Sequence, residues 1–218
     1  GGIGSSKDPS LYGKLTILNR NQPSSHGIPG KPVLSDDNGQ DTGILDGDYH
    51  IKMDMWWGEN GKYYKLYEND RLIDTRTMIN HSPNAQTALT SFQGKPNGTY
   101  HYFAELINEQ GTTRSDTLTV TVSQANPSNP VLSNDNWDGD GQFQVHMNMW
   151  WGTNGSTYRL YENGVLIDTQ PLAGQTPQAQ SAVTFIHNKQ MGVYEYRAEL
   201  VNDSGVTSSE TMNVHVAK

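Results

Sequence analysis

The chain has 218 residues, a hydrophobic content of 33% and a formal net charge of −8 at pH 7. This acidic balance argues against a nucleic acid or an anionic membrane as partner, because both need basic patches, and it leaves an uncharged ligand easy to accommodate. The sequence has no cysteine, which excludes disulfides, thiolate zinc sites and a cysteine nucleophile, and it has no run of 18 apolar residues.

Four segments are expected along the chain. Residues 1–30 have the composition of a linker or of residues added by cloning, with Leu15–Leu18 as a candidate short strand. A first domain is expected over residues 31–124, a short linker over 125–129 and a second domain over 130–218. The whole chain is expected to be a fragment of a larger protein.

The two domains follow from an internal repeat. Met53–Gly58 returns as Met147–Gly152, and Trp56 and Trp150 are separated by 150 − 56 = 94 residues. This unit is too long for a solenoid repeat and long enough to be a domain. Duplication also favours a binding function, because doubling a weak site raises avidity, whereas a catalytic centre is seldom doubled within one chain.

Within each copy, short alternating runs separated by turn residues predict antiparallel strands without helices. Asn-Gly pairs such as Asn154-Gly155 and Asn163-Gly164 favour hairpin turns with positive φ. Six or seven strands per copy predict an all-β fold of two tandem immunoglobulin- or fibronectin III-like β-sandwich domains, with a small barrel as the alternative. The strands expected in the first copy are Asp48–Trp57, Tyr63–Glu68, Arg71–Thr75, Gln86–Phe92, Gly98–Asn108 and Asp116–Ser123.

Strand parity separates the two tryptophans of each pair, because neighbouring residues on a strand point to opposite faces. Trp57 and Trp151 alternate with apolar residues and are expected in the core. Trp56 and Trp150 are expected on the solvated face, among polar side chains. These polar neighbours are Lys52 and Asp54 in the first copy and His146 and Asn148 in the second.

An exposed tryptophan among polar side chains is typical of a carbohydrate site. The axial C–H bonds of a pyranose ring stack on the indole, and nearby polar groups bind the equatorial hydroxyls. The alternative is a bulge that turns both tryptophans inward, or packing of Trp56 under a loop or a neighbouring domain. Parity alone leaves both interpretations open.

Three segments carry a family resemblance: Gly30–Leu34, Met53–Gly58 and Tyr194–Gly205. They resemble the start, a strand end and the closing hairpin of the N-terminal, immunoglobulin-like domain of bacterial family 18 chitinases of the chitinase A type. The resemblance covers roughly residues 31–123 and 129–218. It implies a non-catalytic domain that guides crystalline chitin towards a catalytic barrel through exposed tryptophans.

The family's tryptophans can be placed by position. The strand-end tryptophan falls on Trp56 and Trp150. A further exposed tryptophan of the family falls near Asn134, which is not aromatic. Trp137, three residues later, is a candidate substitute, whereas its counterpart in the first copy is Gly39. The first copy is therefore expected to bind less well, or only to supply a spacer.

The loop Asn134–Gly141 resembles the start of a calcium-binding loop, with oxygen ligands at alternate positions and a glycine at the sixth. The glutamate expected at the twelfth position is absent, because Val145 stands there. An ordinary Asx-rich turn is the alternative. No cofactor is expected, and structural calcium stays open as an alternative.

No catalytic set is expected from the carboxylates that recur in both copies. A carboxylate pair can hydrolyse a glycosidic bond, but these residues fall on short strands or hairpin edges, which favours cross-strand pairing or solvation. An enzyme function is therefore not expected. The recurring carboxylates are Glu68, Asp74 and Glu105, with Glu162, Asp168 and Glu199 in the second copy.

The sequence thus predicts a secreted, non-catalytic polysaccharide-binding pair of domains. Chitin is the favoured ligand, with cellulose, mannan or β-glucan as alternatives. A covalently linked catalytic domain is expected in the full-length protein, either a glycoside hydrolase such as a chitinase or a lytic polysaccharide monooxygenase. The alternative function is a spacer or protein-docking module that positions a catalytic domain without binding glycan. The expected ligand-binding residues are Trp56, Trp150, Trp137, Asp54, Asn148, Lys52 and His146.

Overall fold

A computed structural model describes residues 24–218, so the candidate strand at Leu15–Leu18 lies outside the described residues. The strands pair within two separate sets, here called the first domain (β1–β8) and the second domain (β9–β16). The secondary structure from residue 24 onwards consists of strands and turns. This described part accordingly offers no long apolar helix of the kind that crosses a membrane.

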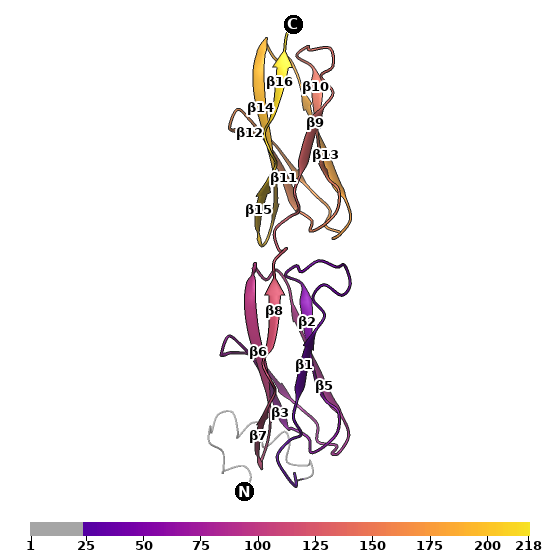
Figure 1. Cartoon of the computed structure of the whole chain (residues 1–218), viewed down its shortest axis with the longest axis vertical. Helices are drawn as coiled ribbons and strands as arrows, with labels where there is room; N and C mark the ends of the chain where they lie inside the picture. The colour runs from indigo at the N-terminus through magenta and orange to yellow at the C-terminus, as the bar shows by residue number, and fades with distance from the viewer. Residues whose placement is uncertain (1–23) are drawn as a thin grey trace. The chain divides into compact units, whose positions relative to one another are not determined.

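The first domain consists of two sheets, a three-stranded one in the order β1-β2-β5 and a longer one in the order β4-β3-β6-β7, with β8 also paired to β6 (Figure 1). The two sheets are separate hydrogen-bonded units, so the fold is a sandwich and not a closed barrel. The strands are β1 (Val33–Asp36), β2 (Tyr49–Met55), β3 (Tyr63–Glu68), β4 (Arg71–Thr77), β5 (Gln86–Phe92), β6 (Gly98–Asn108), β7 (Gly111–Arg114) and β8 (Leu118–Val122).

The second domain repeats this topology, with sheets in the orders β9-β10-β13 and β12-β11-β14-β15, and with β16 also paired to β14. β15 pairs with the end of β14 and β16 with its beginning, so the two short strands act as one interrupted edge strand. The strands are β9 (Val131–Asn134), β10 (Phe143–Met149), β11 (Thr157–Glu162), β12 (Val165–Pro171), β13 (Gln180–Ile186), β14 (Gly192–Asn202), β15 (Gly205–Ser208) and β16 (Met212–Val216).

The core of each domain follows the alternation along β2 and β10. Apolar residues at every second position of these strands are almost completely shielded from water, which confirms the strand parity up to the last strand residue. Burying each such side chain stabilises the fold by about 1.5–3 kcal/mol. The residues are Tyr49, Ile51, Met53 and Met55 in β2, and Phe143, Val145, Met147 and Met149 in β10.

The turn between β11 and β12 is the tight hairpin that the sequence indicates, with Asn163 at φ 49° and Gly164 at φ 82°. The prediction of a similar turn at Asn154-Gly155 is wrong. Asn154 is buried, and the positive φ lies two residues earlier, at Gly152. The reason is tertiary, because the Asn154 side chain holds a loop in place.

Candidate functional site

The two tryptophan pairs lie immediately beyond the strands that lead to them. β2 ends at Met55 and β10 ends at Met149. The side chains of Trp56 and Trp150 are 64% and 66% exposed, which confirms the expectation for these two residues.

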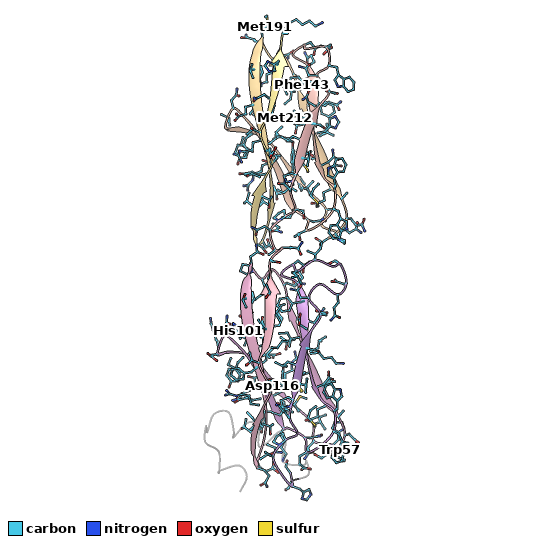
Figure 2. All side chains as sticks on the ribbon, viewed as in Figure 1. Trp57, His101, Asp116, Phe143, Met191 and Met212 are labelled. Atoms are coloured by element: carbon cyan, nitrogen blue, oxygen red, sulfur yellow. The ribbon has the colours of Figure 1, made fainter. Side chains whose placement is uncertain are left out.

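The expectation that Trp57 and Trp151 lie in the core is wrong. Their side chains are 77% and 57% exposed, and Trp57 extends outward from the first domain in Figure 2. Strand parity fails here because the regular strand has already ended. Both members of each pair are therefore available on the surface.

A glycine with a left-handed backbone turns the chain after each pair. Gly58 has φ 135° and Gly152 has φ 129°, in the region that favours glycine. The Gly58 amide donates to the Pro83 carbonyl at 3.1 Å, and the Gly152 amide donates to the Pro177 carbonyl at 3.0 Å. The turn directs both indoles away from the core and attaches their loop to the loop before β5 or β13.

A buried asparagine strengthens this attachment in the second domain. The Nδ2 group of Asn154 donates to the carbonyls of Gly152 at 3.1 Å and Gln178 at 2.9 Å. Its Oδ1 accepts from the Gln175 amide, and its own amide donates to Thr176 Oγ1 at 3.0 Å. Since these bonds are largely shielded from water, losing them leaves backbone groups unsatisfied. The tryptophan loop is thus fixed to the domain.

A buried glutamine completes the arrangement. Gln180 Oε1 accepts from the Gly155 amide, and its Nε2 donates to the Gly155 carbonyl, each at 2.8 Å. The first domain repeats both side chains as Asn60 and Gln86. Both tryptophan pairs are therefore presented by the same buried amide framework.

The polar residues expected beside Trp56 and Trp150 lie on the outer face of the three-stranded sheet, the face that points away from the core. In the first domain Lys52 Nζ lies 3.6 Å from Asp54 Oδ1, a solvated pair that contributes little to stability. In the second domain His146 lies opposite Ser133 and Val183, and Asn148 lies opposite Val131 and Ser181. None of these six positions in the second domain holds an aspartate, glutamate, lysine or arginine.

Trp137 lies on the loop between β9 and β10 and is 91% exposed. It borders a surface hollow of about 450 Å³ that belongs wholly to the second domain. We refer to this feature as the Trp137 hollow. Its other lining residues are Asp135, Asp138, Gln142, Phe143, Gln144, Phe185, Ile186 and His187.

Phe185 and His187 contribute two rings to this hollow, and the sequence did not predict either as a site residue. Phe185 is 61% exposed on β13, and its ring lies parallel to that of His187, with 6° between the planes and 6.4 Å between the centroids. His187 Nδ1 lies 3.1 Å from Gln142 Oε1, and Gln142 Nε2 donates to Asn188 Oδ1 at 2.8 Å. The signal was available, because Phe185 alternates with the inward-facing Thr184 and Ile186 and must therefore point outward.

The loop that resembles a calcium site forms a series of Asx turns. Asn134 Oδ1 accepts from the Asn136 amide at 3.0 Å, and Asp140 Oδ1 accepts from the Gln142 amide at 2.9 Å. Asp135 Oδ1 accepts from the Gln144 amide at 2.6 Å. Across residues 24–218, no group of three or more histidine, aspartate or glutamate side chains is arranged to hold a metal ion.

The recurring carboxylates have structural partners. Glu162 accepts hydrogen bonds from Tyr196 Oη at 2.7 Å and from Lys189 Nζ at 2.6 Å. Burial, with the Glu162 carboxylate beside it, raises the pKa of Tyr196 far above its ordinary value. Asp168 accepts from Thr184 Oγ1 at 2.7 Å. The Glu162–Tyr196 contact is a cross-strand pair, one of the two roles that the sequence favours for these carboxylates.

Comparison with known proteins agrees with this geometry for the second domain. The family model described as "Chitinase A, N-terminal domain" matches residues 138–218. The sandwich therefore resembles that domain, as the sequence motifs indicated, and the first domain is connected to it through the internal repeat. The match associates the chain with accessory modules of carbohydrate-active proteins. Among curated proteins, none matches this chain.

Among solved structures, the fibronectin(III)-like modules of CbhA from Clostridium thermocellum are similar over 90% of this chain and 92% of theirs. The sequence identity is 12% and the TM-score is 0.28. A likeness at this level adds nothing to what the strand pairing of each domain already establishes.

Proposed function

We propose that the chain is a secreted, non-catalytic polysaccharide-binding pair of modules, with chitin as its ligand, from a larger protein that carries a catalytic domain. The observation that carries this proposal is the exposure of both tryptophans at the end of β2 and of β10. Single exposed apolar residues are common on protein surfaces. Four indoles at two equivalent positions are a patterned surface, which calls for a partner.

Stacking against a sugar explains why these indoles remain in water. An indole is the largest apolar side chain, and its flat face suits the C–H face of a pyranose ring. The buried amides Asn60 and Asn154 support this role, because they fix the tryptophan loops before any ligand arrives. A rigid surface loses little conformational entropy on binding.

The choice of chitin rests on the match to the chitinase A N-terminal domain. The acidic net charge of −8 suits an uncharged polysaccharide and opposes an anionic one. Cellulose, mannan and β-glucan satisfy the same stacking chemistry and are the competing ligands. By the same resemblance, the catalytic partner is a chitinase or another enzyme that acts on insoluble glycan outside the cell.

Retention on β-chitin tests the proposal. Replacing Trp56, Trp57, Trp150 and Trp151 together by alanine is expected to lower the partition onto chitin by tenfold or more, because the principal stacking surfaces are removed. A matched control replaces Leu72 and Val165 by serine, since these are exposed apolar residues on β4 and β12 and not on the tryptophan loops. Unchanged retention of the quadruple variant would remove the hypothesis.

Indole fluorescence separates this function from that of a spacer or docking module. Binding predicts a red-shifted, quenchable emission that chitooligosaccharides alter in intensity or wavelength. A spacer predicts emission that these sugars leave unchanged. The same titration with cello-, manno- and laminari-oligosaccharides ranks the competing polysaccharides.

A further inference from the structure

We propose that the Trp137 hollow is a pyranose subsite separate from the tryptophan pair, with Phe185 and His187 as its stacking floor. The inference rests on the proposed function and deepens it, because it names further residues and a place where a sugar ring is bound. It also assigns this subsite to the second domain alone.

The floor follows from strand register. Phe185 lies opposite Gln144 in the pairing of β13 with β10. Its neighbours Thr184 and Ile186 are buried, so its ring points outward. His187 follows directly after the strand, and its ring continues parallel to that of Phe185. Together they form an apolar surface of two flat rings.

The side chain of Gln142 fixes the floor. Its Oε1 lies within hydrogen-bonding distance of His187 Nδ1, and its Nε2 donates to Asn188 Oδ1. Both ends of the amide are therefore engaged, which holds the imidazole ring in place beside Phe185. A stacking surface fixed in this way needs no reordering when a ligand arrives.

The rim supplies hydrogen-bond acceptors. Asp135 and Asp138 line the hollow; Asp135 Oδ1 accepts from the Gln144 amide and Asp138 Oδ1 from the Asp140 amide, which leaves the second oxygen of each carboxylate for a ligand. Carboxylate oxygens accept hydrogen bonds from sugar hydroxyls. Trp137, the most exposed indole of the chain, stands at the edge as a wall against which a ring can pack.

These features select one class of ligand. A volume of about 450 Å³ lies within the range of small-molecule sites. No lysine or arginine lines the hollow, and its two carboxylates repel phosphate, sulfate and uronate groups. An uncharged pyranose residue of a polysaccharide combines an apolar face with hydroxyl donors, and it matches both the floor and the rim.

The hollow lies apart from the tryptophan pair of its own domain. Gln144, at the hollow, lies five residues before Met149, the last residue of β10, which corresponds to roughly 17 Å at 3.3 Å per strand residue, and Trp150 follows Met149. A short oligosaccharide therefore occupies one position or the other. Binding at the hollow survives removal of the tryptophan pairs and can be measured on its own.

The first domain provides a natural comparison. At the positions of Phe185 and His187 it has Ser91 and Gln93, and Gly39 stands at the position of Trp137. The strands beneath are the same, because β5 and β13 cover equivalent residues. Phe185→Ser and His187→Gln therefore give the second domain the two residues that the first domain has at these positions.

The experiment uses the full chain with all four paired tryptophans replaced by alanine, titrated with chitotriose and followed by backbone amide NMR. The expected result is weak binding, with chemical-shift changes at Gln142, Phe185 and His187. Adding Phe185→Ser is expected to lower this residual affinity about tenfold. Val193→Ser, a similarly exposed apolar position on β14, serves as control.

Two outcomes separate the inference from the function beneath it. Wild-type binding that disappears entirely with the four tryptophans, without shifts at the hollow, overturns the subsite and leaves the proposed function standing. A wild-type chain that binds neither chitin nor chitotriose overturns both. His187→Gln gives a second measurement, because its milder change keeps the Phe185 ring and is expected to reduce the residual affinity by a smaller factor than Phe185→Ser.

Discussion

The two domains share their buried framework and differ on the outer face of the three-stranded sheet. Asn60 and Asn154 hold the tryptophan loop in the same way in each domain. In contrast, the aromatic Phe185 of the second domain is Ser91 in the first. What the duplication kept is the geometry that presents two indoles. The side chains on the surface around these indoles differ between the two domains.

The difference extends to charge. On the outer face of the first domain, His50 Nδ1 lies 2.8 Å from Asp37 Oδ2, and Lys52 faces Asp54. In the second domain, His50 is replaced by Gln144. The first domain thus has a histidine–aspartate contact and a lysine–aspartate ion pair where the second has amides and aromatic rings. Solvated ion pairs bind water strongly and offer little to the apolar face of a sugar.

The largest expected effect is the loss of stability when the buried amide framework shared by both domains is disrupted. Asn154→Ala removes two donated bonds and one accepted bond in a buried site, and is expected to destabilise the second domain by about 2–4 kcal/mol. Calorimetric unfolding measures this loss. Asn60→Ala should act in the same way on the first domain, while Asn213→Ala, at an exposed position on β16, controls for a general loss of asparagine. A small effect of Asn154→Ala would show that the loop is held by other contacts.

The next effect compares the two tryptophan pairs. Trp150→Ala with Trp151→Ala leaves the second domain only its hollow, and is expected to reduce affinity for chitohexaose about tenfold. Trp56→Ala with Trp57→Ala leaves the whole second domain intact, so a loss of only a few-fold is expected. Titration calorimetry measures both. Equal losses would contradict the unequal roles of the two modules.

The sequence was sufficient for the strands and the apolar core because both depend on local alternation. Strand parity placed Met53 and Met147 in the core, and the structure agrees. Parity failed at Trp57 and Trp151, since the point at which a strand ends depends on the turn at the following glycine. The prediction of a hairpin turn at Asn154 is wrong because Asn154 is held by residues more than twenty positions away. A local sequence pattern does not show such contacts.

The Trp137 hollow was harder to predict from the sequence than the strands and the core. Trp137 stood out as an isolated aromatic in a polar loop. Phe185 did not, because the alternation that directs its ring outward includes a polar inward-facing residue, Thr184, which weakens the pattern. The first domain has Ser91 at the equivalent position, so comparison of the two copies does not single out Phe185. Local alternation is readable from the sequence, whereas strand ends and contacts between distant residues need the coordinates.

A transplant is expected to have a smaller effect. Ser91→Phe with Gln93→His places the two rings of the hollow on the first domain, and a gain of a few-fold in chitotriose affinity is expected. Gly39 is left unchanged, because its φ of 84° and a Leu45 side-chain carbon 3.0 Å from an added Cβ make tryptophan strained there. Ser91→Leu controls for apolar area without a flat ring. An equal gain with leucine would contradict stacking.

The smallest expected effect is on the free energy of unfolding of the first domain at low pH. Burial alone raises the pKa of Asp37, but hydrogen bonds from the His50 amide and ring, together with their mutual attraction, outweigh it and lower the pKa below its ordinary value. A lowered folded-state pKa gives stability that is present above the unfolded pKa and lost as the pH falls through the folded one.

Asp37→Asn should therefore make the free energy of unfolding of the first domain fall less steeply as the pH is lowered. The difference from wild type at neutral pH should stay within roughly 1 kcal/mol, because the pair is solvated. Asp135→Asn is the matched control, since Gln144 offers the same backbone amide at 2.6 Å without a titratable ring. If both variants shift the acid limb equally, the backbone bond alone explains the effect, and the charge difference between the two outer faces carries no consequence for stability.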